Sequence, residues 1–334
     1  MPIQNERLRQ SFLSALSKRI VMPFDEFVEW ALYDDDTGYY RQSKLRVGKS
    51  KNADFYTSTS IKSFVWEKLL IESCCKLLGK NDPRDFVFVE IAAEPGSNSL
   101  DQKSHPFKAI KTIRLGEPIQ IPDKAIVFSN EWLDAQPFKR FRFDPSCKQW
   151  SEIGVKLQES VLTEETLSDS DKNIEITKQF PQNYSTPYTI DWPTGAEETL
   201  VNLLRINWRG LFVTFDYGLH FDRICTDFPE GTGRTYANHK CSNEITANPG
   251  MEDITCHLCW NALKKILSDH QFTNVNLKNQ ESFFMNNGSE AIRSVIENQQ
   301  ANDEYLGSIK ELIHPQHLGQ KFQVLYGQRG IQMN

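Results

Sequence analysis

Long apolar stretches are missing from this sequence. No run approaches the roughly 18 residues that a helix needs to cross a bilayer. The N-terminal segment, Met1–Ile20, is polar and has no apolar core of the kind found in secretory signals. We therefore expect no membrane span. The expected location is the cytoplasm for a bacterial-type chain, or the mitochondrial matrix if the chain is eukaryotic.

Basic clusters are missing as well. The chain carries 38 Lys and Arg residues against 44 Asp and Glu residues, so its formal net charge is -6. Proteins dedicated to nucleic acids concentrate positive charge on one face to neutralise phosphates. The composition therefore disfavours a nucleic-acid partner.

Cysteine is present in an odd number, seven, in a chain too long to need disulfide staples. This usage is typical of reduced thiols in a cytosolic compartment. The segment Cys256–Cys259, with His239 and Cys241 upstream, resembles half of a zinc site. The upstream pair does not have the spacing of a zinc-binding motif, so we expect no metal.

The chain has 334 residues, of which 39% are hydrophobic. This length and composition predict one α/β domain. Apolar runs that alternate with helical patterns predict a mostly parallel sheet with helices on both faces. We expect a helical lobe at 1–80, an α/β core at 81–135 and 201–334, and an inserted segment at 136–200 with antiparallel strands and a surface loop. The predicted strands are Phe86–Ile91, Ala109–Leu115, Ala125–Ser129, Leu211–Asp216, Asn274–Leu277 and Gly319–Tyr326. The predicted helices are Leu8–Ile20, Phe24–Leu32, Ile61–Leu77, Val201–Trp208, His257–Asp269, Ser289–Asn298 and Ala301–Ile313.

The strand Phe86–Ile91 carries an acid, Glu90, near its end and then breaks into a turn with Pro95 and Gly96. On open α/β sheets such a turn lets the backbone approach a nucleotide-like ligand, and the acid takes the ribose hydroxyls. A buried strand followed by an ordinary turn explains the same residues, so both interpretations stay open.

Polar clusters follow three of the predicted strands, at Glu90–Ser97, Ser129–Pro137 and Asp216–Gly218. Each could be simple loop capping. Because ligands of such sheets bind at the carboxyl ends of the strands, three clusters at one edge favour a functional pocket.

The order of several motifs resembles the MidA-like family of S-adenosylmethionine-dependent methyltransferases. The most specific are Asn-Glu-x-x-Asp-Ala-x-Pro, Asp-Tyr-Gly and Pro-Gly-x-x-Asp-Ile-Thr-x-His. The matching segments are Phe27–Tyr40, Ala53–Ser58, Glu90–Gly96, Ser129–Pro137, Phe215–Gly218, Gly231–Tyr236 with His239, Asn248–His257 and Lys321–Leu325.

The resemblance implies a Rossmann-like class I methyltransferase sheet and S-adenosylmethionine as methyl donor. In the best-known branch, that of the mitochondrial complex I assembly factor, it implies that the methyl group goes to an arginine side chain of a complex I subunit. A guanidinium is always protonated in water, so a site that uses it needs carboxylates to orient it and relieve its charge.

The resemblance also assigns roles. The catalytic candidates are Glu131, Asp134 and Asp216. The donor-binding candidates are Glu90, Ala92, Ala93, Glu94, Gly96, Ser97, Glu117 and Asn130. The substrate-binding candidates are Tyr33, Tyr39, Tyr40, Asp54, Thr57, Arg234 and His257. His239 and Asp253 match family positions without a readable role, and a helix-cap or core position is the alternative for His257.

The departures from the family fall on the donor side. Ala92 and Glu94 stand where the family has glycines, and a side chain there blocks close approach or demands an unfavourable φ. Only Ser97–Ala109 separates the turn from the next strand, so the family's ribose-gripping acid is missing, and Glu117 is the candidate to replace it.

Two classes of function follow. One is an active S-adenosylmethionine-dependent protein methyltransferase. The other is a binding or assembly factor that keeps the fold without catalysis. A nicotinamide-dependent oxidoreductase is disfavoured, because the acid Glu90 precedes the turn instead of following it by about 20 residues.

Overall fold

The computed structural model describes residues 5–44, 46, 54, 64–94, 98–100, 104–168, 174–297 and 303–331. The chain forms two compact units, each built from three separate segments. The first unit comprises Met1–Tyr56, Leu133–Thr199 and Gly218–Cys259, and the second comprises Thr57–Trp132, Leu200–Tyr217 and Trp260–Asn334. The structure thus groups the segments differently from the expected lobe, core and insertion.

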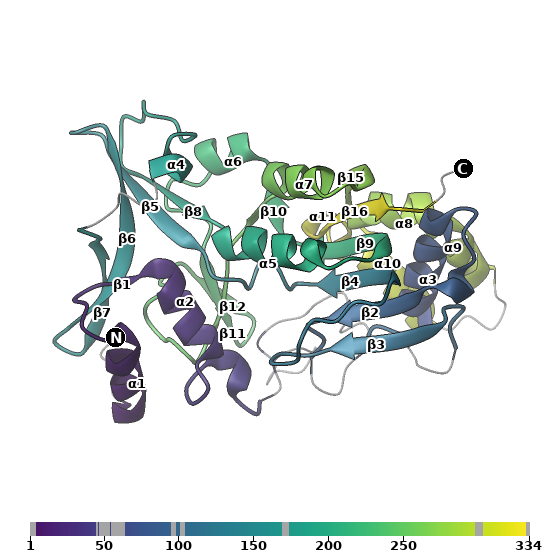
Figure 1. The fold of residues 1–334 in the computed structure, drawn as a ribbon, viewed down its shortest axis with the longest axis horizontal. Coiled ribbons are helices and arrows are strands. Elements are labelled where there is room, and N and C mark those ends of the chain that lie inside the picture. Colours follow the sequence, from purple (N-terminus) through teal and green to yellow (C-terminus); the bar gives the residue numbers. More distant parts are fainter. Residues whose placement is uncertain are drawn as a thin grey trace. The chain divides into compact units, whose positions relative to one another are not determined.

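The second unit contains a six-stranded sheet with the order β15-β16-β9-β4-β2-β3 (Figure 1). Four neighbouring strands, β3, β2, β4 and β9, run parallel, whereas β16 is antiparallel to both β9 and β15. The expected mostly parallel α/β sheet is therefore confirmed. Its strands are β2 (Val87–Ile91), β3 (Ala109–Ile113), β4 (Lys124–Asn130), β9 (Arg209–Asp216), β15 (Thr273–Asn279) and β16 (Gln323–Arg329).

Apolar residues on consecutive positions make the central strands of this sheet. Side chains of a strand alternate between its two faces, and β9 is buried on both. On one face, the Phe215 ring lies against Trp66 of α3 (Phe64–Leu78), with 5.4 Å between the ring centroids. On the other, the ring of Phe212 lies near Phe272. Gly210 (φ +136°) lets β9 approach β4, because a Cβ there would lie 2.0 Å from the carbonyl oxygen of Ala125.

The helices of the second unit depart from the predicted ones in several places. Leu318–Lys321 is a helix, so the strand predicted from Gly319 begins only at Gln323. The helix after the first unit begins at Trp260, not at His257, because Leu258–Cys259 forms a strand. The helix Gln280–Asn287 was not predicted, and the predicted helix Val201–Trp208 is the end of Thr194–Arg205 (α5), which has residues in both units. The others are α3 (Phe64–Leu78), η3 (Pro83–Asp85), α7 (Trp260–Asp269), α8 (Gln280–Asn287), α9 (Ser289–Ile296), α10 (Asp303–Ile313) and α11 (Leu318–Lys321).

The first unit is built on small, mostly antiparallel sheets. The largest has the order β1-β6-β5-β8, with β7 paired to β6, and includes the antiparallel strands expected at 136–200. A three-stranded sheet has the order β12-β11-β13, and β10 pairs in parallel with β14. The strands are β1 (Met22–Pro23), β5 (Lys139–Asp144), β6 (Gln149–Gln158), β7 (Val161–Thr166), β8 (Tyr188–Trp192), β10 (Gly218–Leu219), β11 (Arg234–Ala237), β12 (Lys240–Ser242), β13 (Asp253–Thr255) and β14 (Leu258–Cys259).

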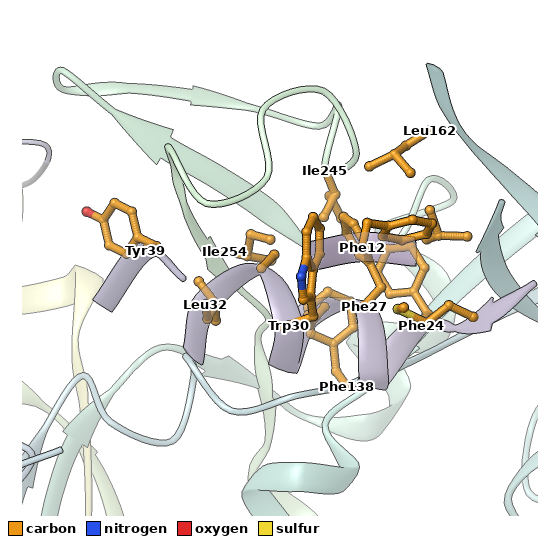
Figure 2. Close-up of a cluster of buried hydrophobic side chains, with 14 of the residues drawn as sticks. Phe12, Phe24, Phe27, Trp30, Leu32, Tyr39, Phe138, Leu162, Ile245 and Ile254 are labelled. Carbon is orange, nitrogen blue, oxygen red and sulfur yellow. The ribbon is translucent and has the colours of Figure 1, made fainter. Parts of the chain in front are cut away.

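The core of the first unit is largely aromatic. Figure 2 shows Phe12 from α1 and Phe24, Phe27 and Trp30 from α2 in one buried cluster. The rings of Phe12 and Trp30 meet edge to face with centroids 5.2 Å apart. The helices of this unit are α1 (Glu6–Leu16), α2 (Phe24–Tyr33), η1 (Tyr39–Arg41), α4 (Ile174–Thr177) and α6 (Phe221–Thr226).

The first helix is shorter than its apolar spacing predicts. It ends at Leu16, and Ile20 lies beyond it with 74% of its surface exposed, so its predicted place on the buried face is wrong. Ser17 adopts a positive φ at the helix end, which turns the chain before Ile20 is reached.

Within the part of the chain that the structure describes, no helix is both long and apolar enough to cross a membrane.

Candidate functional site

Glu90 lies near the end of the buried strand β2, as predicted, but its carboxylate is bound by its own chain. The Ser99 backbone N–H donates to both oxygens at 3.1 and 2.9 Å, and the Ser99 hydroxyl donates to Oε1 at 2.6 Å. Only 5% of Glu90 is exposed. Burial raises the pKa of Glu90, and the bonds from Ser99 oppose that rise. Glu90 is therefore a tightly held acid at the sheet edge.

The turn after β2 begins in a left-handed conformation. Ala92 has φ +61°, and its N–H donates to the carbonyl of Ile113 on β3 at 2.8 Å. The family has glycine here, so the expected unfavourable φ is confirmed at Ala92. Ala93 and Glu94 follow, half-buried, whereas Pro95, Gly96 and Ser97 lie outside the described residues.

Replacing Ala92 with glycine is expected to stabilise the protein. The left-handed region costs an L-residue about 1–2 kcal/mol, and the larger entropy of unfolded glycine offsets about 0.5–1 kcal/mol of the relief. We expect a net gain of about 0.5–1 kcal/mol in urea unfolding. Ala93→Gly is the control, because Ala93 has no positive φ and should lose stability instead. A loss of stability in Ala92→Gly would contradict the assigned strain.

Glu117, the candidate to replace the missing acid, makes a hydrogen bond within its own turn. Its carboxylate accepts a bond from the Arg114 backbone N–H at 2.8 Å and so closes its own exposed turn. The charged side chain directly after β3 is instead Arg114. Its guanidinium donates to Asn98 at 3.0 Å, and its charge lowers the pKa of Glu90. A cation thus replaces the expected acid at this point of the edge.

Three further candidate residues, Asn130, Glu131 and Asp216, lie at the ends of the neighbouring strands β4 and β9. Asn130 pairs with Phe215 in the register, and its amide donates to the Glu131 carboxylate at 2.9 Å. Glu131 has φ +49°, a left-handed conformation that is costly for a side chain and common at functional sites. Asp216 is fully buried and accepts a bond from the Tyr217 N–H at 2.8 Å.

Asp134 belongs to the first unit, because the division between the units falls between Trp132 and Leu133. It is 4% exposed, and its carbonyl accepts a bond from the Cys256 N–H at 2.9 Å. Burial raises the pKa values of Tyr33, Tyr40 and Tyr236, and the charge of Asp134 adds to each of these rises.

The charge of Asp253 also contributes to the raised pKa values of these three tyrosines. The Tyr40 hydroxyl donates to its carboxylate at 2.9 Å, and the rings of Tyr33 and Tyr40 stack with centroids 5.4 Å apart. Tyr236 is the direct cross-strand partner of Asp253, so their side chains leave the same face of the sheet. We call Tyr33, Tyr40, Tyr236, Asp134 and Asp253 the tyrosine–aspartate cluster.

Two of the predicted substrate residues, Arg234 and Tyr33, donate hydrogen bonds to backbone carbonyls. The Arg234 guanidinium donates to the carbonyls of Gly231 and Gly233 at 3.1 and 2.6 Å. Tyr33 donates to the carbonyl of Ala135 at 2.8 Å. These bonds fix the positions of the two side chains.

Asp54 fastens a strained hairpin turn. Asn238 and His239 both have positive φ between β11 and β12, which is a type I′ geometry that favours glycine. The Asp54 carboxylate accepts the Asn238 N–H, and its carbonyl accepts the His239 N–H. The same carboxylate binds the Tyr39 hydroxyl at 2.7 Å and the Lys44 ammonium at 2.8 Å. Thr57 lies outside the described residues.

His257 has the surroundings of a core histidine. Its ring lies edge to face against Phe228, with centroids 5.7 Å apart. Burial and then the charge of Arg234 lower the pKa of His257 to about 4. The ring is therefore neutral at pH 7. No group of three or more side chains suited to a metal ion occurs in the described segments, which include Cys256 and Cys259.

Because the unfolded chain binds a proton at His257 more strongly than the folded chain, stability should fall on acidification. The loss begins near the ordinary pKa of 6.5 and is complete near pH 4, up to about 3 kcal/mol. Urea unfolding of His257→Asn across this range should lack that part of the pH dependence. His317→Asn, at an exposed position, is the control. Identical profiles for His257→Asn and the parent would contradict the assignment.

Sequence reasoning missed the roles of Ser99, Arg114, Tyr236 and Asp253. Asp253 and Tyr236 lie in matched motifs, so their positions were visible, but the cross-strand register that joins them was not. Nothing in the sequence marks Ser99 as the partner of Glu90.

Comparisons with known proteins agree with this architecture. A family model described as "Putative S-adenosyl-L-methionine-dependent methyltransferase" matches residues 78–277. No curated protein matches the sequence. A solved structure described as "likely methyl transferase from Burkholderia thailandensis bound to S-adenosyl-homocysteine" is 18% identical, covers 98% of this chain and 95% of its own, and has a TM-score of 0.79.

A second structure from Burkholderia thailandensis, of an uncharacterized protein, is 17% identical, covers 98% of this chain and 95% of its own, and has a TM-score of 0.76. At such identities the likeness concerns the fold. The family model spans more than half of the 334 residues, and the chain therefore belongs to this S-adenosyl-L-methionine-dependent methyltransferase family.

Proposed function

We propose that the protein binds S-adenosylmethionine and methylates an arginine side chain of a protein partner, as a member of the MidA-like branch. The observation that carries the acceptor assignment is the tyrosine–aspartate cluster, in which Asp134 and Asp253 act on the same stacked pair, Tyr33 and Tyr40. Two buried carboxylates, one of which accepts the Tyr40 hydroxyl, suit a planar cation with several donors.

The donor would be held at the carboxyl edge of the sheet in the second unit. Asn130 fits this role, because its buried Oδ1 has no hydrogen-bond partner among the described residues. Ala92 and Ala93 supply the turn that the donor would approach, and Glu131 and Asp216 would orient groups at the neighbouring strand ends. When bound, the donor supplies an electrophilic methyl group on a sulfonium.

The chain's own residues would prepare the acceptor nitrogen. Asp134 and Asp253 orient the guanidinium and reduce its effective charge, so that one nitrogen is presented for an in-line displacement. The nitrogen–carbon bond forms as the carbon–sulfur bond breaks, and S-adenosylhomocysteine leaves with the sulfur electron pair. The surplus proton of the methylated guanidinium then passes to a cluster carboxylate and on to water.

The second candidate is a binding or assembly factor that no longer transfers methyl groups. Two features of the donor side favour this second candidate. Ser99 already donates hydrogen bonds to the Glu90 carboxylate, and the charge of Arg114 acts on the same carboxylate. In either case we propose a protein partner, such as a subunit of respiratory complex I, in the cytoplasm or the mitochondrial matrix.

Calorimetric titration with S-adenosylhomocysteine and S-adenosylmethionine tests the donor assignment. Micromolar binding is expected, followed by transfer of labelled methyl from S-adenosylmethionine to arginine-containing peptides but not to matched lysine peptides. Folded protein that binds neither compound at millimolar concentration would exclude the enzyme and leave the binding factor. Binding with transfer to lysine peptides alone would exclude the arginine acceptor.

A further inference from the structure

The three-stranded sheet of the first unit has an open edge. Its strand order is β12-β11-β13, and among the described strands β12 (Lys240–Ser242) pairs only with β11 (Figure 1). All three residues of β12 are exposed. An edge strand presents a row of backbone N–H and C=O groups, to which another chain can add a further strand.

Cys241 turns its backbone groups to this open edge. The two-residue turn Asn238–His239 joins β11 to β12, and Ala237 and Lys240 are the partners that flank it. Such a turn is closed by a hydrogen-bonded pair, and hydrogen-bonded and non-hydrogen-bonded pairs alternate along an antiparallel ladder. The next pair, Tyr236 and Cys241, is therefore of the second kind, so the N–H and C=O of Cys241 point away from β11.

The side chains of the same row lead from this edge to the tyrosine–aspartate cluster. Cys241 lies directly opposite Tyr236 on β11, and Tyr236 lies directly opposite Asp253 on β13, so the three side chains leave one face. Burial raises the pKa of Tyr236, and Cys241 and then Asp134 add to this rise, whereas Arg234 opposes it. An antiparallel strand beside β12 would continue the row. About 10 Å, two strand spacings, would separate its residue opposite Cys241 from Tyr236, which an extended arginine and the tyrosine side chain cover together.

A cavity of about 340 Å³ adjoins the hairpin, and its lining includes Thr235, Lys240 and Ser242, which share the opposite face. Thr235 is 2% exposed, and its buried hydroxyl oxygen has no hydrogen-bond partner in the described part of the chain. A buried hydroxyl in this state suits a polar ligand group, since a new bond would satisfy it. In an added strand, the neighbours of the residue opposite Cys241 would direct their side chains to this face.

We propose that the protein substrate binds as an antiparallel strand beside β12, with its target arginine opposite Cys241 and polar residues on either side of that arginine. This inference rests on the proposed function and adds how the acceptor protein is recognised. The N–H and C=O of Cys241 bind the backbone of the arginine, and its guanidinium extends over Tyr236 toward Asp134 and Asp253. The charges are complementary, since both aspartates are buried carboxylates and the entering side chain is a cation. The substrate class is therefore an extended segment, not a helix.

Cys241→Pro tests the backbone contact. Proline lacks the N–H that would bind the substrate, and it is tolerated at an edge position whose N–H faces outward. In the full chain, we expect an unchanged urea midpoint and unchanged S-adenosylhomocysteine affinity. KM for an arginine peptide should rise at least about tenfold, while the rate at saturating peptide stays the same.

Thr166→Pro is the matched control. Thr166 is exposed on β7, an edge strand that pairs with β6 after a two-residue turn, and the same alternation points its N–H outward. We expect this variant to keep the KM of the parent, because β7 has no residue in the tyrosine–aspartate cluster.

Modified peptides give an independent measurement on the parent chain. Methylation of the backbone nitrogen of the target arginine removes the donor to the Cys241 carbonyl, so KM should rise at least about tenfold. Methylation of either neighbouring backbone nitrogen should have little effect, because those nitrogens point away from β12. This comparison decides the matter if Cys241→Pro does not fold.

Equal KM values for the parent and folded Cys241→Pro would overturn the inference and leave the proposed function standing. An equal rise in KM for Thr166→Pro, or equal effects of methylation at the arginine and at its neighbours, would do the same. A parent chain that transfers methyl groups to no arginine peptide would overturn the inference together with the proposed function.

Discussion

Asp134→Asn is expected to slow methyl transfer to an arginine peptide by at least about 100-fold and to leave S-adenosylhomocysteine affinity unchanged. Asn keeps the shape of the side chain but removes the negative charge that would orient the guanidinium and take its proton. Because Asp134 is buried in the tyrosine–aspartate cluster, no water can replace that charge at low cost. Single-turnover rates with saturating donor, together with calorimetry, separate the two effects.

Asp253→Asn tests the other carboxylate of the cluster. Its amide oxygen can still accept the Tyr40 hydroxyl, so the stacked pair should stay in place while the charge is lost. We expect a smaller reduction in rate than for Asp134→Asn. Asp35→Asn is the control, because the Asp35 side chain is 92% exposed and pairs with Arg41 at the surface. Full activity in Asp134→Asn and Asp253→Asn would remove the cluster from the mechanism.

Arg140→Met is expected to destabilise the protein by about 3–5 kcal/mol. The Arg140 guanidinium donates to both oxygens of Asp191 at 2.7 and 3.0 Å, and the two side chains are 5% and 0% exposed. Removing the cation leaves Asp191 as an uncompensated buried charge. Asp191 also accepts the Gly233 N–H at 2.7 Å, just before β11, so the variant should loosen the strand that carries Tyr236.

Arg142→Met is the matched control for this prediction. Arg142 lies on the same strand and pairs with Glu164, but 43% of its side chain is exposed, so we expect a loss below about 1 kcal/mol. Urea unfolding measures both variants, and hydrogen exchange at β11 reports the local effect. Equal losses for Arg140→Met and Arg142→Met would show that burial of the ion pair does not matter.

Most of the sheet could be predicted from the sequence because its signals are local. Runs of consecutive apolar residues in β2, β4 and β9 mark strands buried on both faces. Helix α8 gave no such signal, because it buries polar Gln280 and Asn287 beside Phe283 and Phe284. The boundary at Leu258–Cys259 depends on pairing with β10, a contact across many residues that helical spacing cannot reveal.

The candidate site divides in the same way. The predicted strand ends correctly placed Glu90, Asn130, Glu131 and Asp216 at one edge of the sheet. Parallel strands bring their carboxyl ends to the same edge. The environments of these residues could not be predicted. The contact of Ser99 with Glu90 forms because the chain folds back on itself after a turn. Burial raises the pKa of Tyr40, and Asp253 and Asp134 add to this rise, although they lie far from Tyr40 in the sequence.

Strand β16 follows every other strand of its sheet in the chain, yet it lies between β15 and β9. During synthesis on the ribosome, the edges of β9 and β15 that pair with β16 therefore stay unpaired until Gln323–Arg329 has emerged. Open edges recruit other chains, and nascent proteins in this state rely on chaperones. Substitutions that weaken β16 should consequently appear first as low soluble yield in cells, before any purified protein shows a defect in activity.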